Sequence, residues 1–436
     1  MNEILIPREN DKMLKMLKKK KQKMKSNFII LILIFVFVGV SASVFEDLIE
    51  GDFNEGEMIG VEYNSSGFLQ LSSENLTGNF TSQIFDSGSL SAWNNFSWMS
   101  NAFGELPNNQ DIETSFVEGN ANMSGNIGLW HLNDGVGVSI FVDDSGNSND
   151  VSCSGSTCPA WITSGKLGAG AYNFDGGTDT LIRNTLVLGT SATFETWANA
   201  DTFEPYTMLF NHPSSASANY FNVLFYNGLI SFNTGDGANN PIKYANGTSI
   251  PITFVSLGDW HHYALVISAD LNKAIFYFDG VNVGNATYKN PTSTSTRIFG
   301  LGGVSPYLWN GLIDEFAIYN HSLSLNEIQE HYERGIIKLN LSVKSCDDLI
   351  CEGENWVDIE DQSPRTLSLE DNTYFQYKFD FSTGNINYTP KLYNISIDYT
   401  LFDVLEPQLN LNKLEDNSNI SSQNIIFNFT SIEDYP

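Results

Sequence analysis

Two stretches of the sequence hold side chains of the types that bind metals or catalyse reactions. The segment VDDSGNSNDV, residues 142–151, gathers carboxylate, amide and hydroxyl groups in one loop. Oxygen ligands of this kind suit Ca²⁺, although the segment lacks the closing Glu of an EF-hand. The same composition is typical of a turn whose side chains cap their own backbone, so both interpretations stay open. The second stretch, GDWHHYALV, places His261 and His262 side by side.

The two adjacent histidines lie in a run that reads as a β-strand. Successive side chains of a strand point to opposite faces, so His261 and His262 cannot bind one ion together. Both faces of residues 260–267 are largely apolar, which favours a central, buried strand. We therefore predict that the histidines are structural or surface groups. The remaining histidines show no ligand-like spacing either: His131, His212, His321 and His331.

Cleavage of glycosides needs a pair of carboxyl groups that project into one cleft. Two acids separated by one residue on a strand would share a face, but residues 127–336 contain no such pair. Asp314 and Glu315 are adjacent and are predicted to face opposite ways. The acids at 327, 330 and 333 fall on an expected helix, where a solvated face explains them. We predict that the protein is not an enzyme, although acids from different strands can still converge.

Composition indicates an all-β protein. Aromatic residues make up 13% of the 436 residues, Gly and Asn turns recur at short intervals, and helical periodicity is almost absent. The formal net charge of −29 excludes nucleic acid and anionic membrane surfaces as partners, because both require basic patches. A chain of this length is expected to hold more than one domain.

The N-terminal segment, residues 1–43, has the organisation of an export signal. Nine basic residues precede the apolar run FIILILIFVFVGV, which small residues follow. This order predicts a signal peptide cleaved after Ala42 or Ser43. An uncleaved membrane anchor is the alternative, and it would be the only contact with a membrane. The protein is therefore expected to be secreted or held at the cell surface. Many N-x-[ST] sequons are compatible with a glycoprotein.

The four cysteines occur as two close pairs. Cys153 and Cys158 enclose SGST, and Cys346 and Cys351 enclose DDLI. In an exported chain, such spacing predicts two local disulfides. A zinc site would need four converging ligands, which two separate pairs do not supply.

Residues 127–336 carry a series of motifs that resembles the LamG-like jelly-roll domains of the concanavalin A-like lectin/glucanase group. The motifs are, in order, GLWHLND, DDSGNSND, GKLGAGAYNFDGGTD, FETWANAD, GDWHHYALV, AIFYFDGVNVG and GLIDEFAIYNHSLSLNEIQEHY. The resemblance implies a two-sheet jelly-roll sandwich and a surface protein of prokaryotes, archaea included. Ser324 and Glu327 form a capping box that predicts a helix at the end of this segment, stopped by Gly335.

The segments on either side of the jelly roll share an alternating, aromatic-rich pattern. Residues 60–118 are too few to close a core alone, and residues 337–401 have the same texture. We predict one β-sandwich, split by insertion of the jelly roll into a loop. The alternative is two small independent β-segments. Residues 402–436 are read as the start of a truncated Ig-like repeat.

The resemblance also implies a binding function. Members of this group that hold calcium use acids from such loops and from outer strands, so the candidate calcium ligands are Asp134, Asp144, Asp150, Asp175 and Asp314. Carbohydrate binding needs aromatic platforms with polar groups in a concave site. The aromatic candidates in or near loops are Tyr206, Tyr220, Tyr226, Tyr307 and Trp309.

The sequence thus predicts a non-catalytic extracellular protein that binds a glycan or a surface protein through loops on a rigid sandwich. A purely structural component of the cell envelope and a polysaccharide-active glycoside hydrolase are the alternatives. The ligand and the oligomeric state are left open by the sequence.

Overall fold

The computed structural model describes residues 42–203, 206–212, 221–233, 239–287, 296–359 and 363–402. The predicted signal or anchor over 1–43 and the predicted Ig-like strands over 402–436 lie almost wholly outside these residues. Within the described residues, we find no helix that combines the length and the apolar character needed to cross a bilayer.

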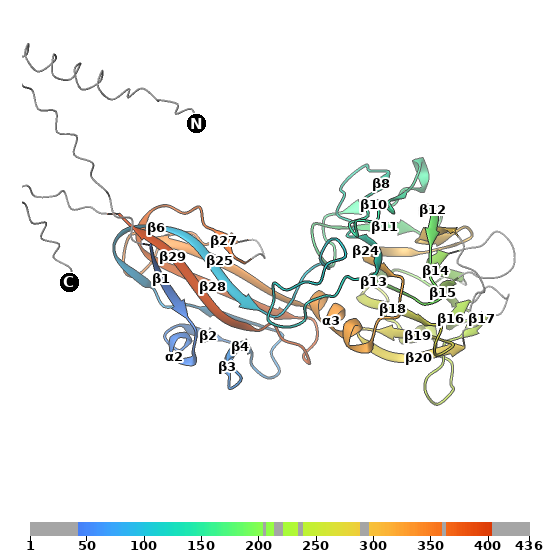
Figure 1. Cartoon of the computed structure of the whole chain (residues 1–436), viewed down its shortest axis with the longest axis horizontal. Coiled ribbons are helices and arrows are strands. Elements are labelled where there is room, and N and C mark those ends of the chain that lie inside the picture. Colours follow the sequence, from blue (N-terminus) through green and yellow to red (C-terminus); the bar gives the residue numbers. More distant parts are fainter. Residues whose placement is uncertain are drawn as a thin grey trace, which may run out of the picture. The chain divides into compact units, whose positions relative to one another are not determined.

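Two antiparallel sheets form the central sandwich (Figure 1). The first holds, in spatial order, β10 (Ala160–Ile162), β11 (Ala171–Asp175), β24 (Asn310–Tyr319), β13 (Ala192–Ala200), β18 (Trp260–Ser268), β19 (Lys273–Phe278) and β20 (Val281–Thr287), with β7 (Asn126–Trp130) paired to β24. The second holds β17 (Asn239–Pro241), β16 (Leu229–Asn233), β15 (Phe221–Tyr226), β14 (Tyr206–His212), β21 (Thr296–Leu301), β12 (Leu181–Val187), β9 (Val151–Ser152) and β8 (Ile140–Phe141). A short ribbon pairs β22 (Gly303–Val304) with β23 (Tyr307–Leu308), and the 3₁₀ turns are Gly155–Thr157 and Ile252–Phe254. The predicted all-β jelly roll is confirmed.

The core between these sheets follows from the alternation of side chains along each strand. On β18, Leu265 and Ile267 enter the main core, whereas Ala264 and Val266 pack in a separate cluster on the outer face. Across the core, Phe194 of β13 stacks on Phe210 of β14, with ring centroids 4.5 Å apart. The sheet therefore buries both of its faces, as the sequence of β18 predicts.

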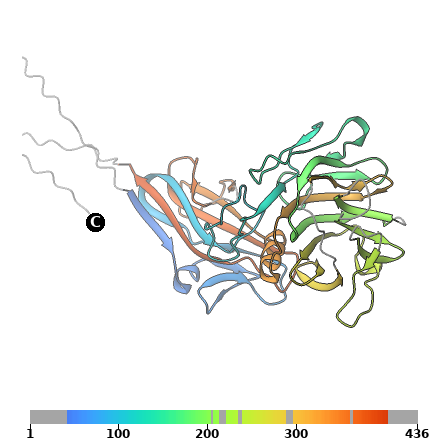
Figure 2. The same ribbon diagram turned by 45° about the vertical axis from the view of Figure 1, so that its right-hand side comes forward.

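Strands from both flanks of the jelly roll pair in one further sheet (Figures 1 and 2). Its order is β2 (Glu57–Ile59), β5 (Thr77–Thr81), β28 (Asn372–Thr383), β6 (Phe85–Ser100), β29 (Leu392–Leu401), β4 (Phe68–Leu71) and β3 (Val61–Asn64). Off this path, β1 (Ala42–Asp47) pairs with β29, β25 (Ile337–Cys346) with β28 and β26 (Val357–Ile359), and β27 (Arg365–Thr366) with β6. Helix α2 spans Glu50–Phe53. The paired strands begin at Ala42, earlier than the expected start at residue 60.

Helix α3 (Leu325–Ile336) follows the last strand of the jelly roll. The predicted capping box is present, since Ser324 Oγ accepts from the Glu327 N–H and the Glu327 carboxylate accepts from the Ser324 N–H. Gly335 does not stop the helix as predicted. It lies inside the last turn of the helix. A Cβ at this position would meet the indole of Trp197 at 2.3 Å, so the glycine allows the helix to pack closely against that ring.

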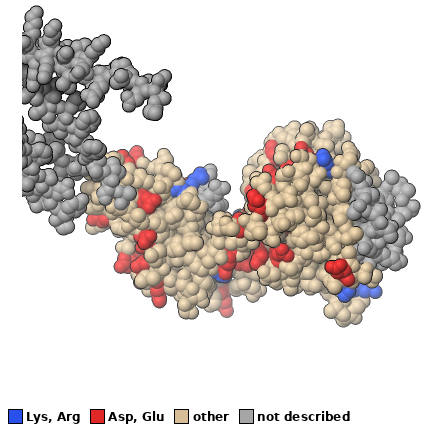
Figure 3. Space-filling view, in the orientation of Figure 1, with Lys and Arg blue, Asp and Glu red and all other residues tan. Residues whose placement is uncertain are grey.

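Both predicted disulfides form, Cys153 with Cys158 and Cys346 with Cys351. Acidic side chains are widespread on the face drawn in Figure 3 and basic ones are few, in keeping with the net charge of −29.

Candidate functional site

Three tyrosines from separate segments meet at one place on the jelly roll. Tyr206 begins β14, Tyr226 ends β15, and Tyr307 lies in β23. The ring centroids of Tyr206 and Tyr226 are 4.4 Å apart, and those of Tyr206 and Tyr307 are 5.2 Å apart. Tyr206 is 40% exposed. We call these three residues the tyrosine cluster; it offers aromatic surface and hydroxyl groups to solvent.

The other aromatic candidates have different positions. Trp309 is fully buried in the main core, where it contacts Phe203, Phe225 and Tyr263, so it cannot stack on a ligand. Tyr220 lies outside the described residues. The hydrogen bond between the Tyr206 and Tyr226 side chains raises the pKa of Tyr206.

A group of metal-ligating side chains lies at another part of the jelly roll. His131 follows β7, Glu315 lies on β24, and Glu105 comes from the segment that connects β6 to β7. Their ligand atoms lie within 4.8 Å of one another, and the described residues contain no other such group of three. His131 Nδ1 contacts a Glu315 carboxylate oxygen, and His131 Nε2 lies 2.7 Å from Asn108 Oδ1.

A β-bulge in β24 positions Glu315. The register of β13 against β24 shifts between Glu195 and Trp197, and Glu315 takes a positive φ of 50°. Ile313 and Phe316 consequently enter the same core cluster, which leaves both Asp314 and Glu315 on the side away from it. The prediction that these two acids face opposite ways is therefore wrong, because it assumed an unbroken alternation.

Burial and the closely spaced carboxylates shift the pKa values of Asp314 and His131. Burial, then the neighbouring Glu315 carboxylate, raises the pKa of Asp314 well above its usual range. Burial opposes a charge on His131, but the carboxylates of Glu315, Glu105 and Asp144 outweigh it and raise the pKa of His131 to about 9. An imidazole with two carboxylates suits a borderline ion such as Zn²⁺ better than Ca²⁺, which prefers oxygen ligands alone.

The five predicted calcium ligands do not form one group of converging carboxylates in the described structure. Asp134 and Asp150 accept the backbone N–H groups of Val142 and Asp143, and Asp144 lies near His131. Asp175 accepts three N–H groups of its own turn. Asp314 accepts those of Lys166 and Leu167.

Loop 142–151 is held by its own side chains. Asp143, which was not among the candidate ligands, accepts N–H groups of Leu129, Ser145 and Asn149 at 2.7–3.0 Å. This arrangement corresponds to the turn interpretation of the loop. Calcium binding stays a prediction.

A second buried cluster joins α3 to the jelly roll. Glu195 of β13 is 2% exposed; its Oε1 lies 2.8 Å from His331 Nδ1 and its Oε2 lies 3.7 Å from His262 Nε2. Burial would raise the pKa of Glu195, but the two imidazoles lower it overall. Burial lowers the pKa of His262 to about 4. His262 is buried, in agreement with the predicted buried strand.

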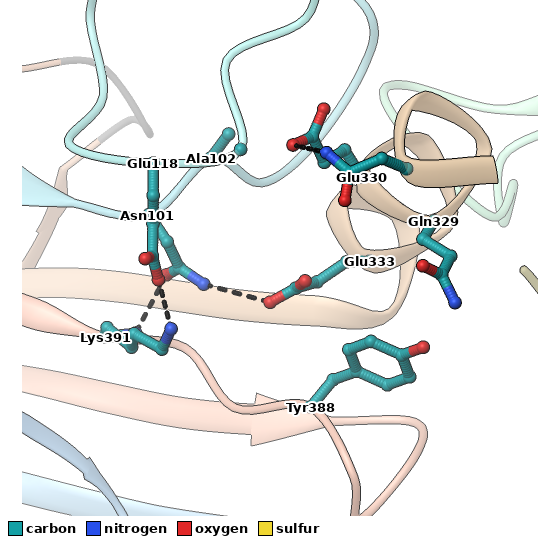
Figure 4. Close-up of a pocket in the computed structure, with 10 residues that line it drawn as sticks. Asn101, Ala102, Glu118, Gln329, Glu330, Glu333, Tyr388 and Lys391 are labelled. Carbon is teal, nitrogen blue, oxygen red and sulfur yellow. Dashed lines mark hydrogen bonds and ion pairs between the residues drawn. The ribbon is translucent and has the colours of Figure 1, made fainter. Parts of the chain in front are cut away.

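A hollow of about 270 Å³ lies between α3 and loops of the split sheet (Figure 4). Its lining residues are Asn101, Ala102, Glu118, Gly119, Asn326, Gln329, Glu330, Glu333, Tyr388 and Lys391. Polar groups of the lining already contact one another: Lys391 forms an ion pair with Glu118, and Asn101 Nδ2 donates to Glu333 Oε1 at 3.4 Å. Burial, opposed in part by Lys391, raises the pKa of Glu333. The polar network thus ties the helix to the split sheet.

Residues 174–329 match a family model described as the concanavalin A-like lectin/glucanases superfamily. The jelly roll is a concanavalin A-like lectin/glucanase domain. The matched residues include the tyrosine cluster, Glu195, His262 and Glu315, whereas Glu105 and His131 precede them. No curated protein matches the chain.

Several solved structures are similar to about half of the chain. Domain 4 of AbnA, an extracellular GH43 arabinanase from Geobacillus stearothermophilus, in complex with arabinotriose, is 16% identical over 48% of this chain and 98% of its own, with a TM-score of 0.38. A Trypanosoma rangeli sialidase is 14% identical over 48% of this chain and 32% of its own, with a TM-score of 0.36. The binding domain of Paraclostridial Mosquitocidal Protein 1 is 13% identical over 51% and 61%, with a TM-score of 0.36.

Sequence reasoning named part of these sites and missed the rest. It named Tyr206, Tyr226 and Tyr307 without showing that they meet. It missed the grouping of Glu105 with His131, because Glu105 lies outside every motif of the concanavalin A-like domain. A histidine directly after one predicted strand and adjacent acids on another were the available signal, but strand order was needed to use it.

The raised pKa of His131 predicts a pH-dependent stability. A histidine whose folded pKa exceeds its unfolded value stabilises the fold fully below the unfolded pKa, and this stabilisation is lost as pH rises through the folded pKa. Between pH 6.5 and about pH 9, the wild type is expected to lose about 2 kcal/mol more unfolding free energy than His131→Gln. Urea unfolding at both pH values measures this difference; equal losses in the two proteins would contradict the assignment.

Proposed function

We propose that this protein is an extracellular protein that binds carbohydrate without cleaving it and acts in adhesion at a cell surface. The observation that carries the proposal is the tyrosine cluster on the concanavalin A-like domain. Sugars present C–H faces to aromatic rings and hydroxyl groups to polar neighbours, and a ligand site needs both. Tyr206 supplies exposed ring surface, and the hydroxyl groups of the three tyrosines supply polar atoms beside it.

Two further observations support an extracellular setting. Both cysteine pairs form disulfides, which persist in oxidising compartments. The strongly acidic composition keeps such a protein soluble and away from anionic surfaces. Export through the N-terminal segment and calcium binding remain parts of the proposal that need their own measurements.

Tyr206→Ala is expected to weaken glycan binding at least about tenfold, because truncating an exposed aromatic anchor removes most of its contact energy. A glycan array identifies a ligand for the full chain, and calorimetry measures the affinities. Tyr206→Phe is the matched control, since it keeps the ring and loses only the hydroxyl; we expect it to bind within about threefold of the wild type.

The opposite outcomes separate the alternatives. An array without any bound glycan, together with self-assembly of the purified chain, would favour a structural envelope component. Release of reducing sugar from a polysaccharide would favour a glycoside hydrolase. Unchanged binding by Tyr206→Ala would move the ligand site away from the tyrosine cluster.

A further inference from the structure

Ser256, His261 and Asp279 form a hydrogen-bonded chain on the surface of the concanavalin A-like domain. Ser256 Oγ lies 2.7 Å from His261 Nε2, and His261 Nδ1 lies 2.8 Å from Asp279 Oδ2. Ser256 is exposed, whereas the His261 and Asp279 side chains are 14% and 28% exposed. This is the order of contacts found in a serine nucleophile, its base and the acid that orients the base.

Each member is held in place by a different element. Ser256 follows the 3₁₀ turn Ile252–Phe254, His261 opens β18, and Asp279 forms the tip of the β19–β20 hairpin with a positive φ of 48°. Asp279 Oδ1 accepts the His262 N–H at 2.9 Å, and the Asp279 N–H donates to the His262 carbonyl at 2.9 Å. The carboxylate is therefore fixed by the backbone of the strand that carries the imidazole.

The imidazole is fixed in orientation as well. The His261 ring packs on Phe278, with centroids 4.5 Å apart, and meets Tyr263 edge-on at 6.4 Å. An ionised carboxylate only accepts hydrogen bonds, so in the neutral imidazole Nδ1 carries the proton and donates it to Asp279. Nε2 is then left as the acceptor for the Ser256 hydroxyl, which is the tautomer that a general base requires.

We propose that Ser256, His261 and Asp279 hydrolyse carboxylic esters that carry a small acyl group. Ser256 Oγ attacks the ester carbonyl while its proton passes to His261 Nε2. The bond to the alcohol then breaks, and the alcohol leaves with that proton. Water attacks the acyl-serine, passes one proton to Nε2, and releases the carboxylic acid as Ser256 regains its proton.

The surroundings of Ser256 set the substrate class. Phe254, 37% exposed, contacts Phe278 edge-on at 5.1 Å and supplies an apolar wall, but Ser256 itself is open to solvent. Among the described residues, the N–H of Leu257 has no hydrogen-bond acceptor, so it is available to a carbonyl oxygen that develops negative charge. An open serine beside a small apolar wall suits an acetyl ester better than a long acyl chain.

A fluorophosphonate probe tests the nucleophile directly. The Ser256 oxygen should form a bond to phosphorus and expel fluoride, giving one adduct on Ser256 that peptide mass mapping locates. Ser256→Ala should lose the adduct, and Asp279→Asn should react at least about 100-fold more slowly. Ser66→Ala, which removes an exposed serine that contacts no histidine, is the matched control and should react like the wild type. Hydrolysis of p-nitrophenyl acetate should follow the same order.

His261→Gln provides the deciding variant if Asp279→Asn disturbs the hairpin, as judged by its melting temperature. It should also react at least about 100-fold more slowly than the wild type. The proposal is overturned if Ser256 stays unlabelled in the folded wild type, or if His261→Gln reacts at the wild-type rate.

Discussion

Glu195→Ala is expected to lower the free energy of unfolding by about 3–5 kcal/mol. The carboxylate is fully enclosed between His331 of α3 and His262 of β18, at 2.8 Å and 3.7 Å from their ring nitrogens. Truncation of the Glu195 side chain leaves two buried imidazoles without their acidic partner and opens a cavity between α3 and β13. Uncompensated polar groups in such a site cost more than the lost contact itself.

Chemical unfolding of the full chain, followed by tryptophan fluorescence, measures this loss. Trp197 reports on the same place, since its ring lies 5.2 Å from that of His262. Glu330→Ala on the partly exposed face of α3 is the matched control, and we expect it to change stability by less than about 1 kcal/mol. A loss below about 1 kcal/mol in Glu195→Ala as well would show that the buried cluster contributes little.

Gly311→Ala is expected to destabilise the concanavalin A-like domain by about 4 kcal/mol, the sum of backbone strain and overpacking. Gly311 has a φ of +133°, a conformation that L side chains rarely adopt. A Cβ there would lie 2.1 Å from the carbonyl oxygen of Asn199 on the paired strand β13. Backbone atoms of a central sheet cannot move aside as the end of a flexible side chain can.

Gly228→Ala separates the two causes. Gly228 has a positive φ of 74° but has nothing within 4 Å of the added Cβ, so only strain applies. We expect a loss of about 1 kcal/mol there. Thermal unfolding of both variants tests the comparison, and equal losses would mean that the close approach of β24 to β13 is not a constraint.

The sequence by itself determined the class of the protein and much of its central domain. Alternation along residues 260–267 predicted a strand buried on both faces, because side-chain direction in a strand depends only on position parity. The spacing of Ser324 and Glu327 determined the start of α3, and the spacing within each cysteine pair predicted its disulfide. These are local properties, and they need no knowledge of strand order.

Only the tertiary structure decided which side chains meet. The β-bulge at Glu315 reverses the expected direction of one of the two acids, and the sequence of Asp314 and Glu315 gives no sign of a bulge. Tyr206 and Tyr226 meet across the consecutive strands β14 and β15, and Asp279 reaches His261 because the consecutive strands β18 and β19 pair. Tyr307 joins its cluster from a segment distant in sequence. The sequence likewise predicts that Gly335 ends the helix, whereas the structure shows that it allows close packing against the indole of Trp197. Contacts of this kind depend on long-range strand order, which residue types and local spacing do not encode on their own.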